Sequence, residues 1–404
     1  GPEAASRGRL HLKRNPEKSV KKMMETYSFT CPTQMEFGPG VLSKLPAAIE
    51  SLHGSKIMLV TDPGVAQAGL LDKVSGVLDG KYSCVVFDRV PSDPNTDAIE
   101  EIYRQAKSEA VDCMVAVGGG SAIDAAKGAS CLVGNGGSLR AYGGVNKVPG
   151  KGLPLVAIPT TAGTGSEFTI FAVLSDLKNE IKFTISSPYI APDLALCDPE
   201  MTLTLPPRVT AATGMDAMTH AVESYTSRIA TPVTDVLCLE AIRLLYRYLP
   251  VAVNNGSDLE ARSRVMLAAS LAGMVMNDAY LGLSHAIASP LGAHFHIPHG
   301  MANAIMLPHV MEYNYMASPA KYGRMAEAMG VQGGRGLYED ARSAIEAVRQ
   351  MTALCHIPAS LREAGAREEM LEQVAKDALL SIQLRFNCRS ATVDQIYELV
   401  KKAC

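Results

Sequence analysis

Short apolar runs that alternate with helical segments restrict the fold of this chain more than any other feature. Between Tyr27 and about Leu205, the apolar runs are unbroken and end in turn-forming or polar residues. These runs are Lys56–Asp62, Cys84–Asp88, Cys113–Gly120 and Pro154–Thr161. Helical candidates such as Thr96–Glu109 and Ser121–Leu132 lie between them. This alternation predicts a parallel sheet with helices on both faces.

The pattern changes after Leu205, where apolar residues recur at helical spacing and β-branched runs become few. The pair Pro206-Pro207 is a natural boundary, because proline is tolerated in the first turn of a following helix. A chain of 404 residues is also too long for a single hydrophobic core. We therefore predict an α/β domain over residues 23–205 and an all-helical domain over residues 206–404.

The first 22 residues differ in composition from the rest of the chain. They are basic, contain almost no large apolar side chain, and begin with Gly1-Pro2. We interpret residues 1–22 as an expression leader or a disordered basic segment that contributes nothing to the fold. A basic transit peptide is the alternative, although Glu3 and Glu17 count against it.

Composition limits the class of protein. The net charge of −3 gives no support for a nucleic-acid partner or an acidic membrane surface. The chain is 47% hydrophobic, yet no apolar run approaches membrane-spanning length, so we expect a soluble globular protein. Its nine cysteines are scattered and form no CxxC pair, which indicates reduced thiols and a cytoplasmic location.

A set of metal-ligating side chains is the strongest functional signal. Asp216 and His220 lie four residues apart in Ala211–Glu223, so on a helix they share one face. A later helical segment, LGLSHAIASPLGAHFHIPHG, adds His285 and His299. One carboxylate and three imidazoles suit a divalent ion such as Fe(II) or Zn(II), with a coordination position left for substrate. The alternative is a group of satisfied polar side chains in a helical core.

Two polar turns follow predicted strands. Gly118-Gly119-Gly120-Ser121 closes a strand and opens a helix, which allows close backbone approach to a phosphate at a helix start. The turn is neither GxGxxG nor a P-loop, so kinase chemistry loses its main support. The second turn, Pro159–Glu167, offers hydroxyls and glycine amides to a phosphate or ribose. A tight turn and local hydrogen bonds are the alternative interpretations.

Asp62 ends the first predicted strand, where an acidic residue can accept hydrogen bonds from an adenosine ribose. A carboxylate there would repel a 2′-phosphate, so it favours NAD over NADP. The alternative is an Asx turn before Pro63.

Together these motifs resemble the iron-containing (group III) alcohol dehydrogenase family, from about Phe37 to the C-terminus. The most specific matches are GGGSAIDAAK (Gly118–Lys127), PTTAGTGSE (Pro159–Glu167), GMDAMTHAVE (Gly214–Glu223) and HIPHGMANAIMLPHV (His296–Val310). The resemblance implies a Rossmann-like dinucleotide domain, then a helical metal-binding domain, with the active site in the cleft between them.

The resemblance also implies a set of site residues. It assigns the metal to Asp216, His220, His285 and His299. The implied cofactor residues are Asp62, Gly118, Gly119, Gly120, Ser121, Asp124, Thr160, Thr161, Thr164, Ser166 and Lys182. The expected reaction is reversible hydride transfer between a primary alcohol and NAD(H), with the metal as a Lewis acid.

One position departs from the family pattern. Many members carry a further histidine four residues after the third metal ligand, where this chain has Ser289. Serine can donate and accept a hydrogen bond but cannot hold a proton near neutral pH. We keep Ser289 and His296 as catalytic candidates for proton transfer, with a structural histidine as the alternative for His296. We expect His294 and His309 to be structural.

Arg385 stands where many relatives have small or neutral residues. A guanidinium near the pocket would suit a carboxylate, sulfonate or phosphonate, whereas a surface arginine is the alternative. We expect an ω-hydroxy acid or an anionic aldehyde, such as 4-hydroxybutyrate, succinate semialdehyde or phosphonoacetaldehyde. Phe171 and Gln383 are the other candidates for substrate contact.

Other functions stay open at this point. A cyclising synthase of the glycerol-1-phosphate dehydrogenase or dehydroquinate synthase type shares the architecture, as does a maleylacetate-type reductase. A non-catalytic nucleotide-binding protein would need no metal set. We expect a small-molecule alcohol or aldehyde substrate, no nucleic-acid or membrane partner and, by resemblance, a homodimer or larger homo-oligomer.

Overall fold

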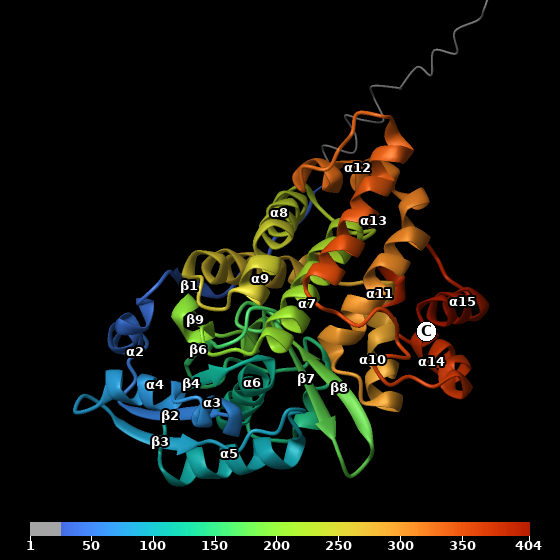
Figure 1. The fold of residues 1–404 in the computed structure, drawn as a ribbon. Coiled ribbons are helices and arrows are strands. Elements are labelled where there is room, and N and C mark those ends of the chain that lie inside the picture. Colours follow the sequence, from blue (N-terminus) through green and yellow to red (C-terminus); the bar gives the residue numbers. More distant parts are fainter. Residues whose placement is uncertain (1–25) are drawn as a thin grey trace, which may run out of the picture.

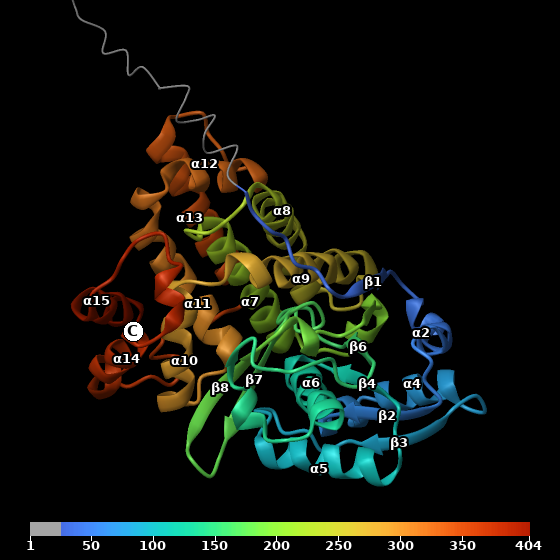
Figure 2. The ribbon, with the colours of Figure 1, turned by 180° about the vertical axis from the view of Figure 1, so that it is seen from behind.

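The computed structural model describes residues 26–404. The segment interpreted as a leader, residues 1–22, lies outside the described residues. An α/β part with a parallel sheet is followed by a helical part, as the sequence predicts. Both views place the six-stranded sheet at one end of the molecule and the helices α12 (Pro319–Ala328) and α13 (Leu337–Leu354) at the other (Figures 1 and 2).

The main sheet has the strand order β1-β9-β6-β4-β2-β3, and every neighbouring pair is parallel. Its strands are β1 (Gln34–Phe37), β2 (Lys56–Thr61), β3 (Ser83–Phe87), β4 (Cys113–Gly118), β6 (Leu155–Pro159) and β9 (Leu194–Cys197). The predicted strands correspond to β2, β3, β4 and β6. Strands β1 and β9, which have only four residues each, were not predicted.

Helices cover both faces of this sheet. They are α2 (Leu45–Ser51), α3 (Pro63–Gln67), α4 (Leu70–Leu78), α5 (Thr96–Ser108) and α6 (Gly120–Asn135). Successive residues of β2 enter different cores: Met58 packs with Ile99 of α5, whereas Leu59 packs with Val74 of α4. Because both faces of the strand are buried, its apolar run is unbroken.

A second, smaller sheet was not predicted. An antiparallel hairpin of β7 (Phe171–Asp176) and β8 (Ile181–Ser186) is extended by β5 (Gly144–Val145). The hairpin projects beside α10 (Leu283–Phe295) in both ribbon views (Figures 1 and 2). It carries Phe171 and Lys182, two of the predicted site residues.

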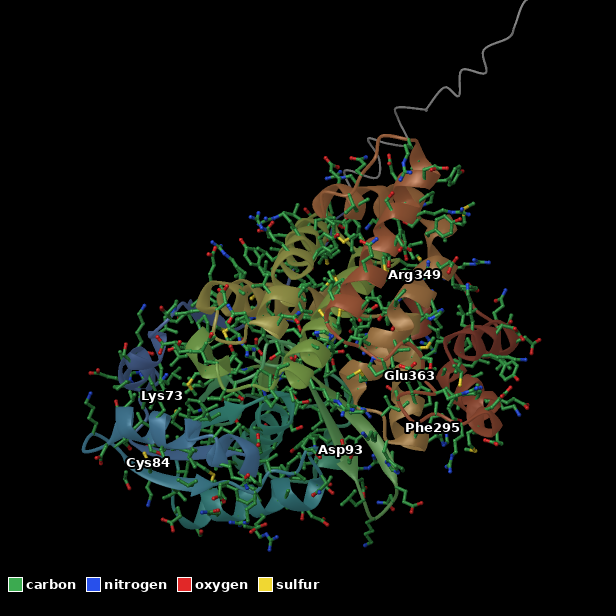
Figure 3. The ribbon with its side chains drawn as sticks, viewed as in Figure 1. Lys73, Cys84, Asp93, Phe295, Arg349 and Glu363 are labelled. Atoms are coloured by element: carbon green, nitrogen blue, oxygen red, sulfur yellow. The ribbon has the colours of Figure 1, made fainter. Side chains whose placement is uncertain are left out.

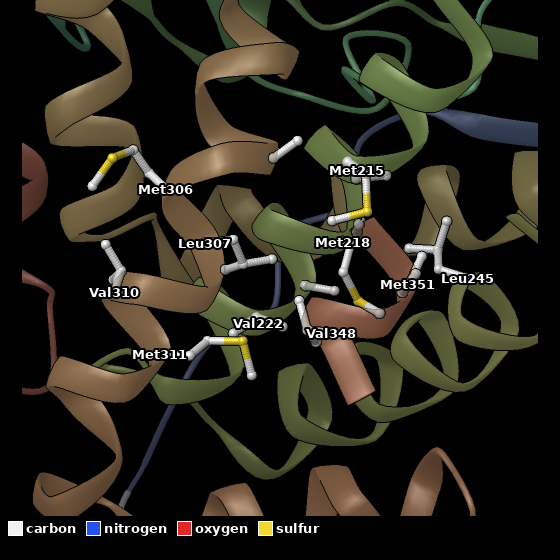
Figure 4. Packing of buried hydrophobic residues seen from close by; sticks show 14 of the residues in the cluster. Met215, Met218, Val222, Leu245, Met306, Leu307, Val310, Met311, Val348 and Met351 are labelled. Atoms are coloured by element: carbon white, nitrogen blue, oxygen red, sulfur yellow. The ribbon is translucent and has the colours of Figure 1, made fainter. Parts of the chain in front are cut away.

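The C-terminal part is helical. Its helices are α7 (Pro207–Thr226), α8 (Pro232–Asn254), α9 (Leu259–Ala279), α10 (Leu283–Phe295), α11 (His299–Asn314), α12 (Pro319–Ala328), α13 (Leu337–Leu354), α14 (Leu371–Leu379) and α15 (Val393–Ala403). The first of them begins at Pro207, next to the predicted boundary. Methionines such as Met215, Met306 and Met351 fill the core between these helices (Figure 4).

Short 3-10 helices connect the longer elements. They are η1 (Val41–Lys44), η2 (Leu139–Tyr142), η3 (Pro188–Ile190), η4 (Pro199–Thr202), η5 (Tyr315–Ala317), η6 (Glu368–Met370) and η7 (Ile382–Arg385). Among residues 26–404, no single helix is long and apolar enough to cross a membrane. Helices α9 and α10 pass that test only as a pair, and they are bent by 104° at the break between them.

The segment that carries His285 and His299 is two helices rather than one. Helix α10 ends where His296 takes a left-handed conformation, with φ of 56°, and α11 begins after Pro298. The left-handed residue ends the helix, and the proline nitrogen cannot donate to continue it. The two histidines therefore reach the site from different directions.

Close glycine contacts join the turn Pro159–Glu167 to the helical part. Gly165 has φ of +64°, and a Cβ on Gly273 of α9 would lie 2.7 Å from its Cα. A Cβ on Gly163 would lie 2.6 Å from Cβ of Thr213 on α7. With no side chain between them, the turn rests directly on α7 and α9.

We predict that Gly273→Ala lowers the midpoint of thermal unfolding. The added methyl would press on backbone atoms of Gly165, and overpacking of this kind costs about 1–3 kcal/mol. The control is Gly76→Ala in α4, where a Cβ meets no atom within 4 Å and alanine favours the helix. Equal midpoints for the two variants would contradict the prediction.

Candidate active site

Three candidate metal ligands lie together in the helical part. Asp216 and His220 are one turn apart on α7, and His285 lies in the first turn of α10. Their ligand atoms all lie within 4.8 Å of one another. Nε2 of His220 and Nε2 of His285 are each 3.6 Å from a carboxylate oxygen of Asp216. Tetrahedral ligands about 2.1 Å from an ion lie about 3.4 Å apart, so the spacing fits a single ion.

His299 lies at the edge of this group. It is the first residue of α11, and its Nε2 is 3.8 Å from Oδ1 of Asp216. Its side chain is 49% exposed, whereas those of Asp216, His220 and His285 are about 5% exposed. The site is therefore closed by the three buried side chains and open on the side of His299. A substrate would arrive from that side.

The hydrogen bonds of His285 leave one ring nitrogen directed at the site. Nδ1 lies 2.6 Å from Oε2 of Glu223, and because a carboxylate accepts, Nδ1 carries the proton. Nε2 is buried and has no hydrogen-bond partner in the described part of the chain. An unpaired buried nitrogen is costly unless something binds it. This arrangement, a histidine held from behind by a carboxylate, fits a metal ligand.

Charge in the site also favours a cation. Burial alone would raise the pKa of Asp216, but the three histidines beside it lower that pKa well below its usual range. Burial lowers the pKa of His220 to about 4, so its imidazole is neutral. Burial opposes a charge on His285, yet Asp216 and Glu223 together raise its pKa to about 9. The buried carboxylate of Asp216 thus favours a positive charge beside it, which a divalent ion would supply.

Glu223 was not recognised as a site residue in the sequence. Its carboxylate accepts hydrogen bonds from the backbone N–H groups of Gly282 and Ser284, at 2.9 and 2.6 Å, and from Nδ1 of His285. A signal was present, since Asp216, His220 and Glu223 follow the i, i+4, i+7 spacing of one helix face. The spacing alone did not reveal that Glu223 faces a histidine about sixty residues later.

The two predicted cofactor turns adjoin each other. Gly119 and Gly120 lie at the start of α6, and a Cβ on either would approach Thr161 or Thr164 to 3.0–3.1 Å. Ser121 donates a hydrogen bond to the backbone oxygen of Ser92 at 2.5 Å. The other turn residues in this group are Gly118, Thr160 and Ser166; the backbone N–H of Thr160 donates to the oxygen of Gly118 at 3.0 Å. The free N–H groups of α6 thus open beside a row of hydroxyls, which suits a pyrophosphate.

Asp62 caps the short helix α3. Its Oδ1 accepts hydrogen bonds from the backbone of Gly64 and Val65, as the Asx-turn interpretation predicts. Its other oxygen lies beside the glycine turn, because a Cβ on Gly118 would be 3.2 Å from Oδ2. The cap therefore uses Oδ1 and leaves Oδ2 available beside the turn Gly118–Ser121.

Helix α6 holds the β7 strand through two buried charges. Oδ2 of Asp124 accepts from the backbone N–H of Val173 at 2.9 Å. Nζ of Lys127 donates to the backbone oxygens of Thr169 and Phe171 at 3.0 and 2.7 Å. Oδ1 of Asp124 lies 3.6 Å from Nζ of Lys127 and has no hydrogen-bond partner in residues 26–404.

Lys182 on β8 forms an ion pair with Asp93 at 3.0 Å, and Ser175 of β7 donates to the same carboxylate. Asp93 lies beside the β7–β8 hairpin (Figure 3). Both charged side chains are more than half exposed. Because Ser92 precedes Asp93 and accepts from Ser121, this ion pair connects the hairpin to the start of α6.

The substrate candidates Phe171, Gln383 and Arg385 occupy different environments. The ring of Phe171 lies 5.7 Å from that of Tyr280, which stacks on Phe386 at 4.4 Å. Oε1 of Gln383 accepts from the backbone N–H of Leu281, so Gln383 supports the turn before α10. Arg385 is exposed and forms no ion pair with any described residue.

The two catalytic candidates also differ from each other. The hydroxyl of Ser289 donates to the backbone oxygen of His285 at 3.3 Å, one turn back on the same helix. His296 is exposed at the C-terminal end of α10. In the part of the chain that the structure describes, neither side chain is hydrogen-bonded to the side chain of a candidate ligand. His294, expected to be structural, pairs with Asp377 of α14 at 2.6 Å.

Comparison with known proteins agrees with this site. Residues 32–199 match the family described as "Iron-containing alcohol dehydrogenase", and residues 210–404 match "Fe-containing alcohol dehydrogenase family, C-terminal". The NAD-dependent methanol dehydrogenase of Bacillus methanolicus is 35% identical over 378 residues, which cover 93% of this chain and 99% of that protein.

Solved structures agree as well. The crystal structure of a 1,3-propanediol oxidoreductase has a TM-score of 0.92 and 37% identity, covering 94% of this chain and 100% of that one. The sulfoacetaldehyde reductase of Bifidobacterium kashiwanohense, solved in complex with NAD+, has a TM-score of 0.87 and 28% identity, covering 94% and 99%. Since both halves of the chain match and the relatives are covered nearly end to end, this chain belongs to the iron-containing alcohol dehydrogenase family and is a metal-dependent NAD(H) alcohol dehydrogenase.

Proposed function

We propose that Asp216, His220, His285 and His299 hold one divalent ion, Fe(II) with Zn(II) as the alternative. The observation that carries this assignment is the Nε2 of His285, which is buried, lies 3.6 Å from Asp216 and has no hydrogen-bond partner among residues 26–404. When bound, the ion supplies Lewis acidity to the oxygen of the alcohol or aldehyde. The half-exposed side of His299 leaves that oxygen a path into the site.

NAD(H) lies along the two adjoining turns in this proposal. The N-terminus of α6 at Gly119, Gly120 and Ser121 holds the pyrophosphate, and the hydroxyls of the second turn face it. Asp62 offers its free oxygen to the adenosine ribose, which favours NAD over NADP. Asp124 and Lys182 complete the cofactor set near the hairpin, close to the nicotinamide end.

Proton transfer needs a group on the open side of the site. Ser289 stands one turn after His285, and His296 is exposed three residues before His299. We infer that the alcohol proton leaves through the ribose hydroxyls and water, with Ser289 or His296 as the relay. His296 is the one that can hold a proton near neutral pH.

The substrate in this proposal is a small primary alcohol or its aldehyde, and an anionic one is favoured. Arg385 at the end of η7 is exposed and free of an ion pair with any described residue, and η7 packs beside the turn that begins α10. A relative of the same fold is a sulfoacetaldehyde reductase, and others act on methanol and 1,3-propanediol by name. Arginine would recognise the acidic end, with Phe171 beside the chain of the substrate.

We also propose a cytoplasmic location and a homodimer or larger homo-oligomer. The location is supported by cysteines that are all free among the described residues.

Removing the metal tests the proposed function. We expect the chelated protein to lose NADH-dependent reduction of propanal and to regain it with Fe(II) or Zn(II), because without the ion no Lewis acid would polarise the aldehyde oxygen. The measurement is NADH absorbance together with metal content. Full activity in protein shown to be metal-free would contradict the assignment.

Replacing Glu223 tests how His285 is held. We expect Glu223→Gln to weaken metal affinity about 10- to 100-fold, because the charge behind a ligating imidazole is lost. Competition with a chelator measures the affinity. Glu240→Gln on α8 is the control, since among residues 26–404 that carboxylate pairs only with Arg243, on the surface. Unchanged affinity in Glu223→Gln would refute the role.

Replacing Arg385 tests the substrate class. We expect Arg385→Ala to lower kcat/KM for succinate semialdehyde and phosphonoacetaldehyde roughly ten- to hundredfold relative to propanal, the effect of one lost charge-assisted hydrogen-bond pair. Arg335→Ala, in the loop before α13, is the control. If the ratio between acidic and neutral aldehydes stays constant, Arg385 does not select the substrate.

A further inference from the structure

Ser284 is a fully buried serine next to the candidate ligand His285. Its hydroxyl donates to Oδ1 of Asn303 at 3.1 Å, and its backbone N–H donates to Oε1 of Glu223 at 2.6 Å. One residue of α10 thus contacts a side chain of α11 and a side chain of α7. Ser284 itself is not a candidate metal ligand.

Asn303 lies on α11, one turn after His299, and is also fully buried. Its Nδ2 is 2.9 Å from Oδ1 of Asp216 and 3.2 Å from Nε2 of His299. A carboxylate only accepts hydrogen bonds, so the amide nitrogen must face Asp216. The amide oxygen is then free to accept from the hydroxyl of Ser284. Every polar atom of the Asn303 side chain is in use.

The two sets of contacts close a ring around the site. The ring runs from Asp216 through Asn303, Ser284 and Glu223 to His285, and all five residues are buried. Its two ends are candidate ligands that face each other, with Nε2 of His285 3.6 Å from Oδ1 of Asp216. An ion bound between these two ligand atoms would close the ring.

We propose that Ser284 is a positioning residue for the metal, and this rests on the proposed ligand assignment. Its hydroxyl fixes the orientation of the Asn303 amide, and its backbone fixes the carboxylate of Glu223. Without the hydroxyl, the buried Oδ1 of Asn303 has no donor, and a turned amide would place that oxygen against the carboxylate of Asp216. The Asp216 carboxylate would then lose its amide donor, whereas the backbone of Ser284 would still hold Glu223 and His285.

The ring also reaches the fourth candidate ligand. One amide hydrogen of Asn303 points at the lone pair of His299 Nε2, the same lone pair that an ion would take. For His299 to join the ion, that hydrogen bond has to be given up. Because Ser284 holds this amide in place, it would also influence the affinity of His299 for the ion.

The test compares Ser284→Ala with Ser270→Ala, another fully buried serine, whose hydroxyl contacts only Cys197 among the described residues. Co(II)-substituted protein is mixed with a chelator, and the rate of Co(II) loss and its visible spectrum are recorded. We expect Ser284→Ala to lose Co(II) about tenfold faster or more, with a shifted spectrum. Ser270→Ala should match the wild type, and Ser284→Thr, which keeps the hydroxyl, should restore the slower loss.

Unchanged Co(II) loss and spectrum in Ser284→Ala would overturn the proposal. If that variant fails to fold, Ser284→Cys provides the same comparison, because a thiol of similar size is a weak donor. Asp216→Asn separates the two levels of inference. If Asp216→Asn holds Co(II) as tightly as the wild type, the ligand assignment itself is wrong. If it loses Co(II) while Ser284→Ala does not, only the role of Ser284 is wrong.

Discussion

The carboxylate of Glu223 is the group on which the active site of this enzyme most depends. It sits on α7, the helix of Asp216 and His220, and it accepts two backbone hydrogen bonds at the start of α10 and the Nδ1 proton of His285. The first N–H groups of a helix have no partner of their own, so Glu223 both anchors α10 and directs its histidine. Gly282 is glycine because a Cβ would lie 2.7 Å from Asn387 and 3.1 Å from Glu223.

Buried charge then explains why the site calls for a cation. Asp216 and Glu223 are both nearly inaccessible, and an ionised carboxylate in such a place is stable only when it is paired or hydrogen-bonded. Glu223 is satisfied by its three donors. Asp216 is left with Asn303 and three imidazoles at distances longer than hydrogen bonds. The negative charge of Asp216 is therefore only partly compensated. It faces the three imidazoles, where a cation would bind.

Two kinds of contact hold the segments proposed to bind NAD(H): close backbone packing of the turn Pro159–Glu167, and buried side chains of α6. The turn around Gly165 touches Gly273 of α9 directly, and α6 grips β7 through Asp124 and Lys127. The turn Pro159–Glu167, proposed to face the nucleotide, also contacts Thr213 of α7, the helix that carries the proposed ligands Asp216 and His220. Hydride transfer requires donor and acceptor to be held at a fixed separation, and a rigid contact between these segments would help to keep it.

The sequence by itself determined the parallel sheet, the helical C-terminal part and the pairing of Asp216 with His220, because unbroken apolar runs and a spacing of four residues are local properties. It did not reveal the β7–β8 hairpin, whose strands mix exposed and buried residues, or the break between α10 and α11 at His296. Only the tertiary structure decided that Glu223, Ser284 and Asn303 join His285 to Asp216. Their hydrogen bonds connect three separate helices, and contacts between distant segments leave no periodic pattern along the chain.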